Sequence, residues 1–259
     1  MSITQIIQQT YSDLKQQQDF SPLNHVINNR LSNLVSALNH SFCLGHVAKD
    51  PALHLERTEL PHLCGKAECE MEKYWARQFN AKSALQTKDL KEFWYYDNYK
   101  ALWDIEKTLF AGVENHHRMV FLGSGALPLT VMIAALENPS LRAVCVDFDP
   151  EACALSQELI AKLGLDQQID VACAAAQDFP YKADDFVVCA SLIEQKEELY
   201  HVLQTIGVDA FAVRDAEDVY CYLYAPSPLP NPAHYKETRR TIPVPACINT
   251  TRFFEKAGR

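Results

Sequence analysis

The stretch Arg118-Met-Val-Phe-Leu-Gly-Ser-Gly-Ala-Leu-Pro-Leu-Thr130 decides the fold, because it is an apolar run that breaks into a glycine turn and resumes as an apolar helix. A second apolar run, Ala143-Val-Cys-Val-Asp-Phe-Asp149, follows and ends in carboxylates. A strand, a glycine turn, a helix and a second strand with acidic residues at its end are typical of the nucleotide-binding half of a doubly wound sheet. The pattern predicts that the chain binds a nucleoside.

The glycine turn indicates which nucleoside. Gly123 and Gly125 have no Cβ, so a ligand can lie close to their backbone N–H groups, and we expect both, with Ser124, to contact it. A dinucleotide fingerprint needs a third glycine at the start of the helix, but Leu127-Pro-Leu129 stands there, and Leu127 is expected to line the site. This argues against NAD.

Asp147 ends the second strand, slightly beyond the spacing of roughly 20 residues expected for a carboxylate that accepts hydrogen bonds from ribose hydroxyls. A ribose without a diphosphate favours S-adenosylmethionine as co-substrate. The alternative is structural: the Gly-Ser-Gly segment is then a tight turn, and Asp147 a helix cap. The two features together favour the cofactor.

Charge and hydropathy exclude other classes of partner. The chain has 259 residues and a formal net charge of −9, and it lacks the clustered Lys and Arg that nucleic-acid phosphates require. No apolar run reaches the roughly 18 residues needed to span a bilayer, and the first residues are polar and Gln-rich rather than basic and apolar. We expect a cytoplasmic protein with small-molecule substrates and neither a nucleic acid nor a membrane as partner.

The nine cysteines predict neither disulfides nor a metal site. Their number is odd, and several lie in apolar, strand-like runs, where a free thiol behaves as a small hydrophobe. Cys64 and Cys69 have no CxxC partner and only His62 as a nearby imidazole, so a zinc site is poorly supported. His116-His117 is expected to be a solvated loop. No metal is therefore expected.

The chain is expected to divide into two domains. Residues 1–112 have helical periodicity and almost no glycine, which predicts an N-terminal helical domain whose apolar helices before residue 60 could support a homodimer. Residues 113–259 predict an α/β, Rossmann-like, S-adenosylmethionine-binding domain with a parallel, doubly wound sheet. The elements expected there alternate as Met119–Leu122, Pro128–Glu137, Ala143–Val146, Pro150–Leu163, Ile169–Ala174, Asp185–Ala190, Lys196–Ile206 and Ala210–Arg214.

Two late strands, Tyr220–Tyr224 and Asn249–Glu255, are expected to close the sheet as an antiparallel hairpin. The intervening segment Ala225-Pro-Ser-Pro-Leu-Pro-Asn-Pro232 cannot be helix or central strand, because proline removes the backbone donor and restricts the residue before it. It predicts a loop that borders the active site.

The carboxyl ends of the other strands nominate further ligand-binding residues. Gln177 and Asp178 follow one strand, where an amide or carboxylate can bind an adenine amino group, and Ser191 follows the next, beside the expected sulfonium. Arg214 ends the fifth strand and could hold a substrate carboxylate as a bidentate pair. Alternatively, Asp178 caps a loop and Arg214 pairs with an acidic neighbour in the sequence.

Four motifs in the right order resemble those of nicotianamine synthases. Phe121-Leu-Gly-Ser-Gly-Ala-Leu-Pro-Leu-Thr130 resembles the family's loop signature, and Leu63-Cys-Gly-Lys-Ala-Glu-Cys-Glu-Met-Glu-Lys-Tyr-Trp75 its glutamate-bearing helix. Phe93-Trp-Tyr-Tyr-Asp-Asn-Tyr99 is similar to its aromatic segment, and Ala190-Ser-Leu-Ile with Val213-Arg214 to its later strands. The resemblance covers roughly residues 60 to 255, and motifs at four places make it more specific than a single glycine loop.

The chain departs from plant and archaeal members at Ala126, where proline is common, and at Asp215-Ala-Glu217. These features look more like the bacterial branch that makes opine metallophores of the staphylopine and pseudopaline type. That resemblance implies transfer of the 3-amino-3-carboxypropyl (aminobutyrate) group of S-adenosylmethionine to the amine of histidine, with release of methylthioadenosine. It leaves open D- or L-histidine, the number of groups added and the metal that the product binds.

The resemblance nominates Glu72, Glu68 and Tyr96 as catalytic and Tyr95 and Tyr99 as substrate-binding. The glutamates lie four residues apart on one helical face, where a carboxylate can hold an ammonium and then accept its proton. The tyrosines can present ring faces to a sulfonium. From composition alone, the favoured alternative for Glu68 and Glu72 is a solvated helix face on which they pair with Lys66 or Lys73. For the tyrosines, the alternative is packing between the two domains.

Three other functions remain open: nicotianamine synthase proper, an ordinary methyltransferase that leaves S-adenosylhomocysteine, and a nucleoside-binding protein without turnover. The Leu-Pro-Leu segment and the glutamate helix weigh against the methyltransferase. A nucleoside-binding protein would keep the glycine loop but have no use for the glutamates and tyrosines. If the transferase assignment holds, the helical domain is expected to act as a lid that excludes water from the sulfonium.

Overall fold

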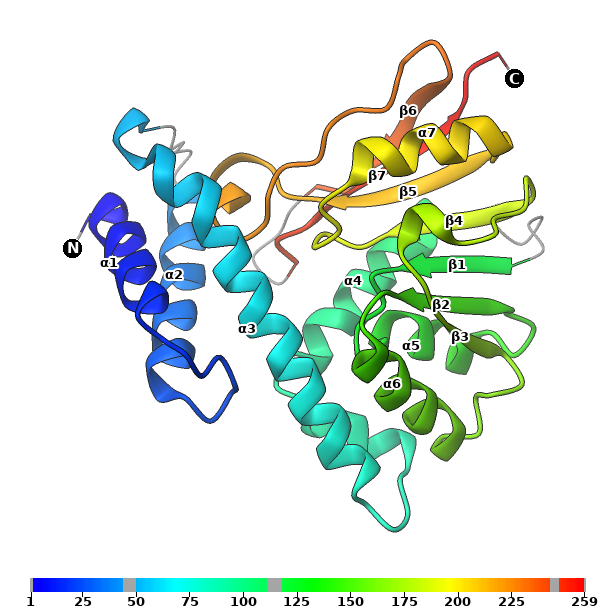
Figure 1. Ribbon diagram of the computed structural model, residues 1–259, viewed down its shortest axis with the longest axis horizontal. Helices are drawn as coiled ribbons and strands as arrows, with labels where there is room; N and C mark the ends of the chain where they lie inside the picture. The colour runs from blue at the N-terminus through cyan, green and yellow to red at the C-terminus, as the bar shows by residue number, and fades with distance from the viewer. Residues whose placement is uncertain (1, 44–49, 111–117, 243–246, 259) are drawn as a thin grey trace.

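The computed structural model describes residues 2–43, 50–110, 118–242 and 247–258 (Figure 1). Its centre is a seven-stranded sheet of order β3-β2-β1-β4-β5-β7-β6, which confirms the predicted α/β class. The first five strands are parallel, and β7 lies antiparallel between β5 and β6. The strands are β1 (Arg118–Leu122), β2 (Ala143–Asp147), β3 (Ile169–Cys173), β4 (Asp185–Cys189), β5 (Ala210–Asp215), β6 (Tyr235–Arg240) and β7 (Thr250–Lys256).

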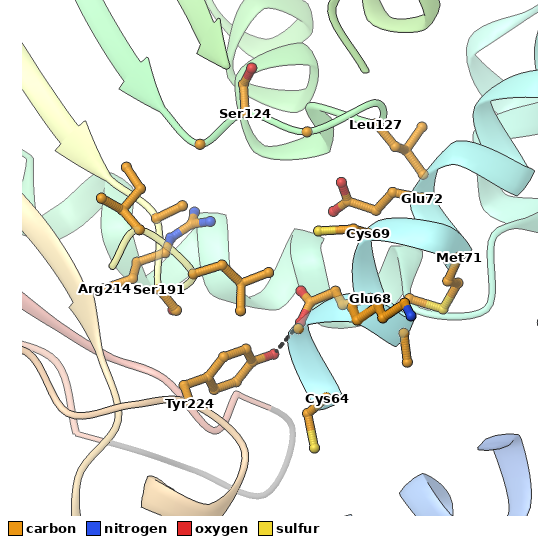
Figure 2. Close-up of a pocket in the computed structure, with 18 of the residues that line it drawn as sticks. Cys64, Glu68, Cys69, Met71, Glu72, Ser124, Leu127, Ser191, Arg214 and Tyr224 are labelled. Carbon is orange, nitrogen blue, oxygen red and sulfur yellow. Dashed lines mark hydrogen bonds between the residues drawn. The ribbon is translucent and has the colours of Figure 1, made fainter. Parts of the chain in front are cut away.

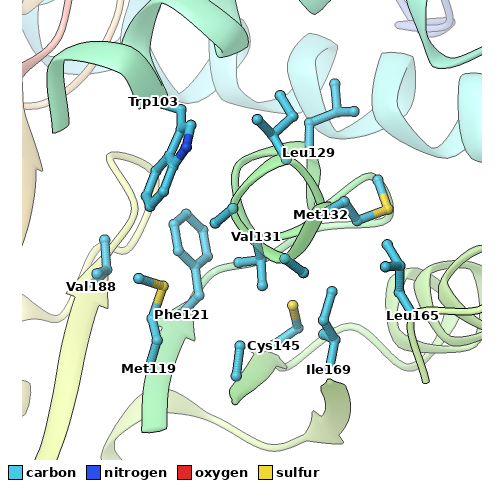
Figure 3. Close-up of a cluster of buried hydrophobic side chains, with 14 of the residues drawn as sticks. Trp103, Met119, Phe121, Leu129, Val131, Met132, Cys145, Leu165, Ile169 and Val188 are labelled. Carbon is cyan, nitrogen blue, oxygen red and sulfur yellow. The ribbon is translucent and has the colours of Figure 1, made fainter. Parts of the chain in front are cut away.

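Helices cover both faces of the sheet, as a doubly wound fold requires. The helices that alternate with the strands are α5 (Leu129–Glu137), α6 (Pro150–Lys162) and α7 (Lys196–Ile206). On one face, α5 packs Val131 and Met132 against Phe121 and Cys145 of the strands (Figure 3). Because α5 is apolar on nearly every side, it can be buried between the sheet and α4. On the other face, α7 packs on the strands through a separate core.

The N-terminal part of the chain is helical, as predicted. Its elements are α1 (Ile3–Lys15), α2 (His25–Cys43), η1 (Pro51–Leu53), α3 (His54–Asn80), η2 (Thr87–Glu92) and α4 (Tyr96–Leu109). In Figure 1, α3 runs diagonally between the α1–α2 pair and the sheet layers. Ile7, Leu34 and Leu60 form a core with the other apolar faces of the first three helices.

The predicted strand Tyr220–Tyr224 is wrong. The chain forms instead the 3₁₀-helix η5 (Asp218–Tyr222), whose side chains pack among α1, α2 and α3. Val219, Tyr220 and Tyr222 are all fully buried. A half-buried strand would instead alternate buried and exposed side chains along the segment. Asp218 turns the chain with a φ of 53°, a left-handed conformation that aspartate tolerates better than most residues.

The hairpin partner of β7 is β6, not the tyrosine segment. Its sequence Tyr-Lys-Glu-Thr-Arg-Arg is polar and charged, as is common for an edge strand that must resist pairing with another chain. The sequence therefore lacks the alternation of apolar and polar residues by which a strand is predicted.

The division between residues 1–112 and 113–259 stays a prediction, and packing crosses it in both directions. Trp103 and Phe110 join the core of the sheet, and η5 joins the helical core. His116-His117 lies outside the described residues.

The eight cysteines whose side chains are described are free thiols, and six of them are buried. Across the described ranges, no helix is long and apolar enough to cross a membrane. The same residues contain no group of three or more His, Cys, Asp or Glu side chains arranged to hold a metal ion.

Candidate active site

A cavity of about 1060 Å³ lies between α3 and the carboxyl ends of the parallel strands (Figure 2). Its volume lies at the upper end of the range of small-molecule sites, roughly 300–1,000 Å³. Its walls come from the glycine loop, from the segments after β2 and β4, from α3 and α4, and from the Pro-rich segment, where Ala225, Pro226 and Pro228 line it as predicted. The strand-end position is where the doubly wound topology places a ligand.

The glycine loop is built by backbone hydrogen bonds. Gly123 and Gly125 have φ values of 67° and 64°, which only glycine adopts without strain. The N–H groups of Gly123 and Ser124 both donate to the carbonyl of Val146. The hydroxyl of Ser124 is buried, lines the cavity and has no hydrogen-bond partner in the described part of the chain. A buried hydroxyl of this kind is satisfied when a ligand supplies the partner.

Asp147 is oriented by the same loop. Its Oδ2 accepts the N–H of Gly125 at 2.8 Å and its Oδ1 accepts the N–H of Asp149 at 2.9 Å. Each carboxylate oxygen has a second lone pair, so the side chain can still accept two hydroxyl donors. Asp147, Ser124 and the glycine loop therefore fit a nucleoside with a free ribose.

Two carboxylates of α3 face the cavity from the other side. Tyr99 of α4 donates its hydroxyl to Oε1 of Glu72 at 3.0 Å, and Tyr224 donates to Oε2 of Glu68 at 2.9 Å. Neither glutamate has a Lys, Arg or His nitrogen within 4 Å among the residues that the structure describes. The predicted alternative, a solvated face paired with Lys66 or Lys73, is not what the structure contains: Lys66 lies over the ring of Phe20 and Lys73 pairs with Asp149.

The environment makes both glutamates weak acids. Burial raises the pKa of Glu72 well above its ordinary value, and the negative charge of Glu68 raises it further. Burial also raises the pKa of Glu68, although the hydrogen bond from Tyr224 lowers it in part. The pKa of Tyr99 is raised well above its usual value by burial and by Glu72, so the phenol keeps its proton and remains a donor.

Twelve of the residues nominated from the sequence line this one cavity: Glu68, Glu72, Tyr95, Tyr99, Gly123, Ser124, Gly125, Leu127, Asp147, Gln177, Ser191 and Arg214. Two do not. Tyr96 packs against the sheet core and does not line the cavity, and its side chain lies about 100° around the helix from that of Tyr95. Asp178 is exposed, and its backbone N–H closes a turn with Ala175.

Arg214 lies on the cavity wall with two of its nitrogens already bound. Its Nε and Nη2 donate to the two oxygens of Glu106 at 2.9 and 2.7 Å, and Nη2 also donates to Thr130. The carboxylate that Arg214 holds as a bidentate pair is therefore that of Glu106, and not a substrate carboxylate as predicted. The acidic neighbours proposed as alternatives pair elsewhere, Asp215 with Arg252 and Glu217 with Arg240.

Sequence reasoning missed Glu106 and Tyr224. Glu106 is fully buried on the face of α4 that also carries Leu102, Trp103 and Leu109, and an acidic residue at a core-facing helical spacing was the available signal. Tyr224 follows η5 and was hidden by the wrong strand assignment.

The segment after β4 also touches α3. His62 Nδ1 lies 2.9 Å from Glu194 Oε1. A Cβ on Gly65 would come 2.9 Å from Leu192, so this glycine makes room for the segment. Asn249 holds Ser191 through a 2.6 Å hydrogen bond. The wall after β4 is thus fixed both to the helix and to the entry of β7.

The chain is similar in sequence and in fold to known proteins. The family model described as "Nicotianamine synthase protein" matches residues 1–258. An L-histidine 2-aminobutanoyltransferase of Yersinia pestis is 25% identical over 150 residues, which are 58% of this chain and 53% of that protein. Nicotianamine synthase 2 of Arabidopsis thaliana is 29% identical over 109 residues, 41% of this chain and 34% of that protein. The chain thus spans about half or less of the length of these relatives.

Two solved structures share the fold over nearly the whole chain. MtNAS in complex with MTA and tNA has a TM-score of 0.80 at 19% identity, covering 98% of this chain and 97% of that chain. A mutant of MtNAS in complex with S-adenosylmethionine has a TM-score of 0.75 at 18% identity, covering 97% of each chain. The match of the family model to residues 1–258, with the fold and the order of the motifs, shows that the chain belongs to the nicotianamine synthase family.

Proposed function

We propose that the protein transfers the 3-amino-3-carboxypropyl group of S-adenosylmethionine to the amine of histidine and releases methylthioadenosine, in the biosynthesis of a nicotianamine-like opine metallophore. One observation carries the proposal: Glu68 and Glu72, two carboxylates without a cationic partner in the described residues, line the same cavity as a glycine loop that suits a nucleoside. Both reactants are amino acids that bring ammonium groups, which such carboxylates can bind.

The residues around the glycine loop fit S-adenosylmethionine. Asp147 is available to the ribose hydroxyls, and the orphaned hydroxyl of Ser124 can bind a polar group of the ligand. Gln177 lines the end of the cavity near the carboxyl end of β3, the position expected for adenine. When bound, S-adenosylmethionine supplies a sulfonium, which makes each of its three attached carbons an electrophile.

The proposed reaction forms one carbon–nitrogen bond and breaks one carbon–sulfur bond. The amine nitrogen of the acceptor forms a bond with the methylene carbon attached to sulfur, the carbon–sulfur bond breaks, and its electron pair stays on the sulfur of methylthioadenosine. The nitrogen loses one proton, which a cavity carboxylate accepts. Selection of this carbon over the methyl carbon depends on orientation, because only a carbon held in line with the nucleophile reacts at a useful rate.

Glu72 is the better placed of the two carboxylates to accept that proton. It lies against the glycine loop, and the Tyr99 hydroxyl fixes its rotamer. A raised carboxyl pKa brings its basicity closer to neutrality, where proton transfer from an ammonium is most efficient. The helical region covers the cavity and is proposed to exclude water from the sulfonium.

Histidine is proposed as the acceptor because two kinds of support agree. The motifs resemble the bacterial opine-metallophore branch, and curated relatives of Yersinia pestis and of Pseudomonas aeruginosa carry the name L-histidine 2-aminobutanoyltransferase. These relatives are matched over 53% and 38% of their lengths.

Mass spectrometry of the protein incubated with S-adenosylmethionine and either L- or D-histidine tests the proposal. The expected products are methylthioadenosine and an aminobutyryl-histidine adduct from one isomer. S-adenosylhomocysteine would identify a methyltransferase. Methylthioadenosine formed with S-adenosylmethionine as the only amino acid would identify S-adenosylmethionine itself as the acceptor. Binding without either product would contradict the enzymatic assignment.

A further inference from the structure

The two carboxylate–phenol pairs of the cavity occupy different places. Glu72 lies on the nucleoside side, because a Cβ on Gly125 of the glycine loop would come 2.0 Å from its Oε2. Glu68 lies one helical turn earlier and turns to the opposite wall, toward Tyr224 (Figure 2). The pairs therefore face different parts of whatever fills the cavity.

Tyr224 is held in place by contacts with η5 and the helical core rather than with the sheet. Its N–H donates to the carbonyl of Tyr220, and Leu223 before it is buried in the helical core. After it the chain enters the proline segment, whose Ala225 and Pro226 continue the same wall of the cavity. This wall carries none of the groups that suit a nucleoside, which lie on the glycine loop and after β2.

The negative charge of Glu68 has no cationic partner among the described residues. Glu68 accepts one hydrogen bond, from Tyr224, and the described residues place no Lys, Arg or His nitrogen within 4 Å of it. Arg214, which lines the same cavity, is already paired with Glu106. A carboxylate held in a low-dielectric wall by one phenol and left without a cation is a site for a cation.

We propose that Glu68 and Tyr224 form the subsite for the ammonium group of the acceptor, with Glu68 as the binding carboxylate and Tyr224 as its positioning residue. The inference rests on the proposed function. The two pairs then have different roles. Glu72 with Tyr99 serves the reacting centre beside the nucleoside, and Glu68 with Tyr224 selects an acceptor that has a primary amine. The phenol donates to the ionised carboxylate, so it favours the charged form that an ammonium needs.

The test compares Tyr224→Phe and Glu68→Gln with the wild-type chain, measuring methylthioadenosine release while the acceptor is varied at saturating S-adenosylmethionine. The probe is the histidine isomer that the wild type uses. Loss of a hydrogen bond to a charged group predicts an acceptor KM about 10- to 100-fold higher in Tyr224→Phe. The dissociation constant of S-adenosylmethionine, measured by calorimetry, is expected to change less than twofold.

The matched control is Tyr220→Phe. It removes a phenol hydroxyl from the same segment, one that donates to Asn39 at 2.8 Å and does not line the cavity. Its acceptor KM is expected to equal that of the wild type. The pH dependence is a second readout: without the phenol, Glu68 binds its proton more readily, so the rise of acceptor KM toward low pH should begin at a higher pH in Tyr224→Phe.

The outcomes separate this inference from the proposed function. If histidine is a substrate and both variants keep the wild-type acceptor KM, or lose affinity for S-adenosylmethionine by the same factor, the subsite is refuted and the function stands. If histidine is not a substrate, a panel of free amino acids replaces it. Methylthioadenosine release with one of them, and a raised KM in Tyr224→Phe, supports the subsite alone, whereas release with none overturns both.

Discussion

The carboxylate of Glu72 lies in the glycine loop, against Gly125. A Cβ built on Gly125 would come 2.0 Å from Oε2 of Glu72, and Leu127 of the same loop lines the cavity beside it. In a dinucleotide-binding loop the backbone N–H groups at this place receive a diphosphate. Here a side chain of the protein takes the position of the anion. A loop that already holds a carboxylate disfavours a diphosphate, which agrees with the cationic ligand of the proposed function.

This contact predicts that Gly125→Ala abolishes transfer. The new methyl group cannot share its space with the Glu72 carboxylate, and the φ of 64° is unfavourable for alanine by about 1 kcal/mol. We expect a rate of methylthioadenosine release at least about 100-fold lower, because the base is displaced from the reacting centre.

Gly164→Ala is the matched control. Gly164 has a φ of 69°, and a Cβ there meets nothing within 4 Å, so it carries the same backbone cost without the clash. Both variants should lose similar thermal stability, and only Gly125→Ala should lose activity. Equal rates in the two variants would show that Glu72 need not occupy the loop.

A second prediction concerns Glu72→Gln, which should lower kcat and raise stability together. Loss of a positioned base typically costs about 10²- to 10⁴-fold in rate. The amide keeps the shape of the side chain and removes the buried charge. Melting temperatures measured by calorimetry between pH 4 and 8 check the stability, with Glu92→Gln, an exposed carboxylate, as the control.

The sign of the pH effect follows from linkage. The pKa of Glu72 is raised in the folded protein, so between the unfolded value near 4.5 and the folded value the native state holds more protons, and stability falls as pH rises. The advantage of Glu72→Gln should therefore be absent near pH 4 and grow toward neutral pH. A melting temperature below that of the wild type at pH 7 would contradict the raised pKa.

Much of the sheet could be predicted from the sequence because its central parallel strands β2, β1, β4 and β5 are almost wholly buried. Met119–Leu122 and Ala143–Val146 are continuous apolar runs bounded by turn residues, the pattern that two-sided burial produces. The cavity residues at strand ends followed from topology, since the carboxyl ends of parallel strands meet at one edge. The same reasoning fails at β6, an edge strand whose charges hide its pairing.

The parts of the site that escaped prediction depend on contacts distant in sequence. Tyr224 meets Glu68 across 156 positions, and Arg214 meets Glu106 across 108. The local sequence pattern indicates which face of a helix is polar. It does not indicate which distant residue forms a hydrogen bond or ion pair with a buried charged side chain. Composition favoured a solvated face for Glu68 and Glu72, and the family resemblance alone pointed to the cavity.

Glu106→Gln is expected to destabilise the protein strongly. Glu106 is fully buried and accepts hydrogen bonds from Arg214 and from Thr251, so its loss leaves a buried guanidinium without a counter-charge. Breaking one side of a buried pair costs about 3–5 kcal/mol. At about 2–4 °C per kcal/mol for a chain of this size, the melting temperature should fall by roughly 6–20 °C.

The comparison variant for Glu106→Gln is Glu92→Gln, because Glu92 pairs with Lys82 at a half-exposed position. Exposed pairs contribute about 0.2–1 kcal/mol, so this change should shift the melting temperature by only a few degrees. Near-equal shifts in the two variants would mean that the pair with Arg214 contributes no more than a surface contact.

A final prediction concerns the connection between the two sides of the cavity. Lys73, next to Glu72 on α3, pairs with Asp149 at 2.6 Å, and the N–H of Asp149 donates to the carboxylate of Asp147. The carboxylate of Asp147 in turn accepts the N–H of Gly125, which lies against Glu72. The proposed base and the residues proposed to bind the nucleoside are thus joined in one closed circuit of contacts.

Lys73→Met should therefore weaken S-adenosylmethionine binding and kcat together. A partly exposed ion pair contributes about 0.5–1 kcal/mol, which predicts a change of roughly 2- to 5-fold in each quantity. Lys73→Arg should recover most of the loss, and Lys82→Met, which removes a cation from a pair remote from the cavity, should change neither quantity. Calorimetric titration and initial rates at two ionic strengths distinguish these cases. If Lys73→Met lowers the melting temperature but leaves affinity and kcat at wild-type values, the ion pair stabilises the fold without coupling the base to the nucleoside.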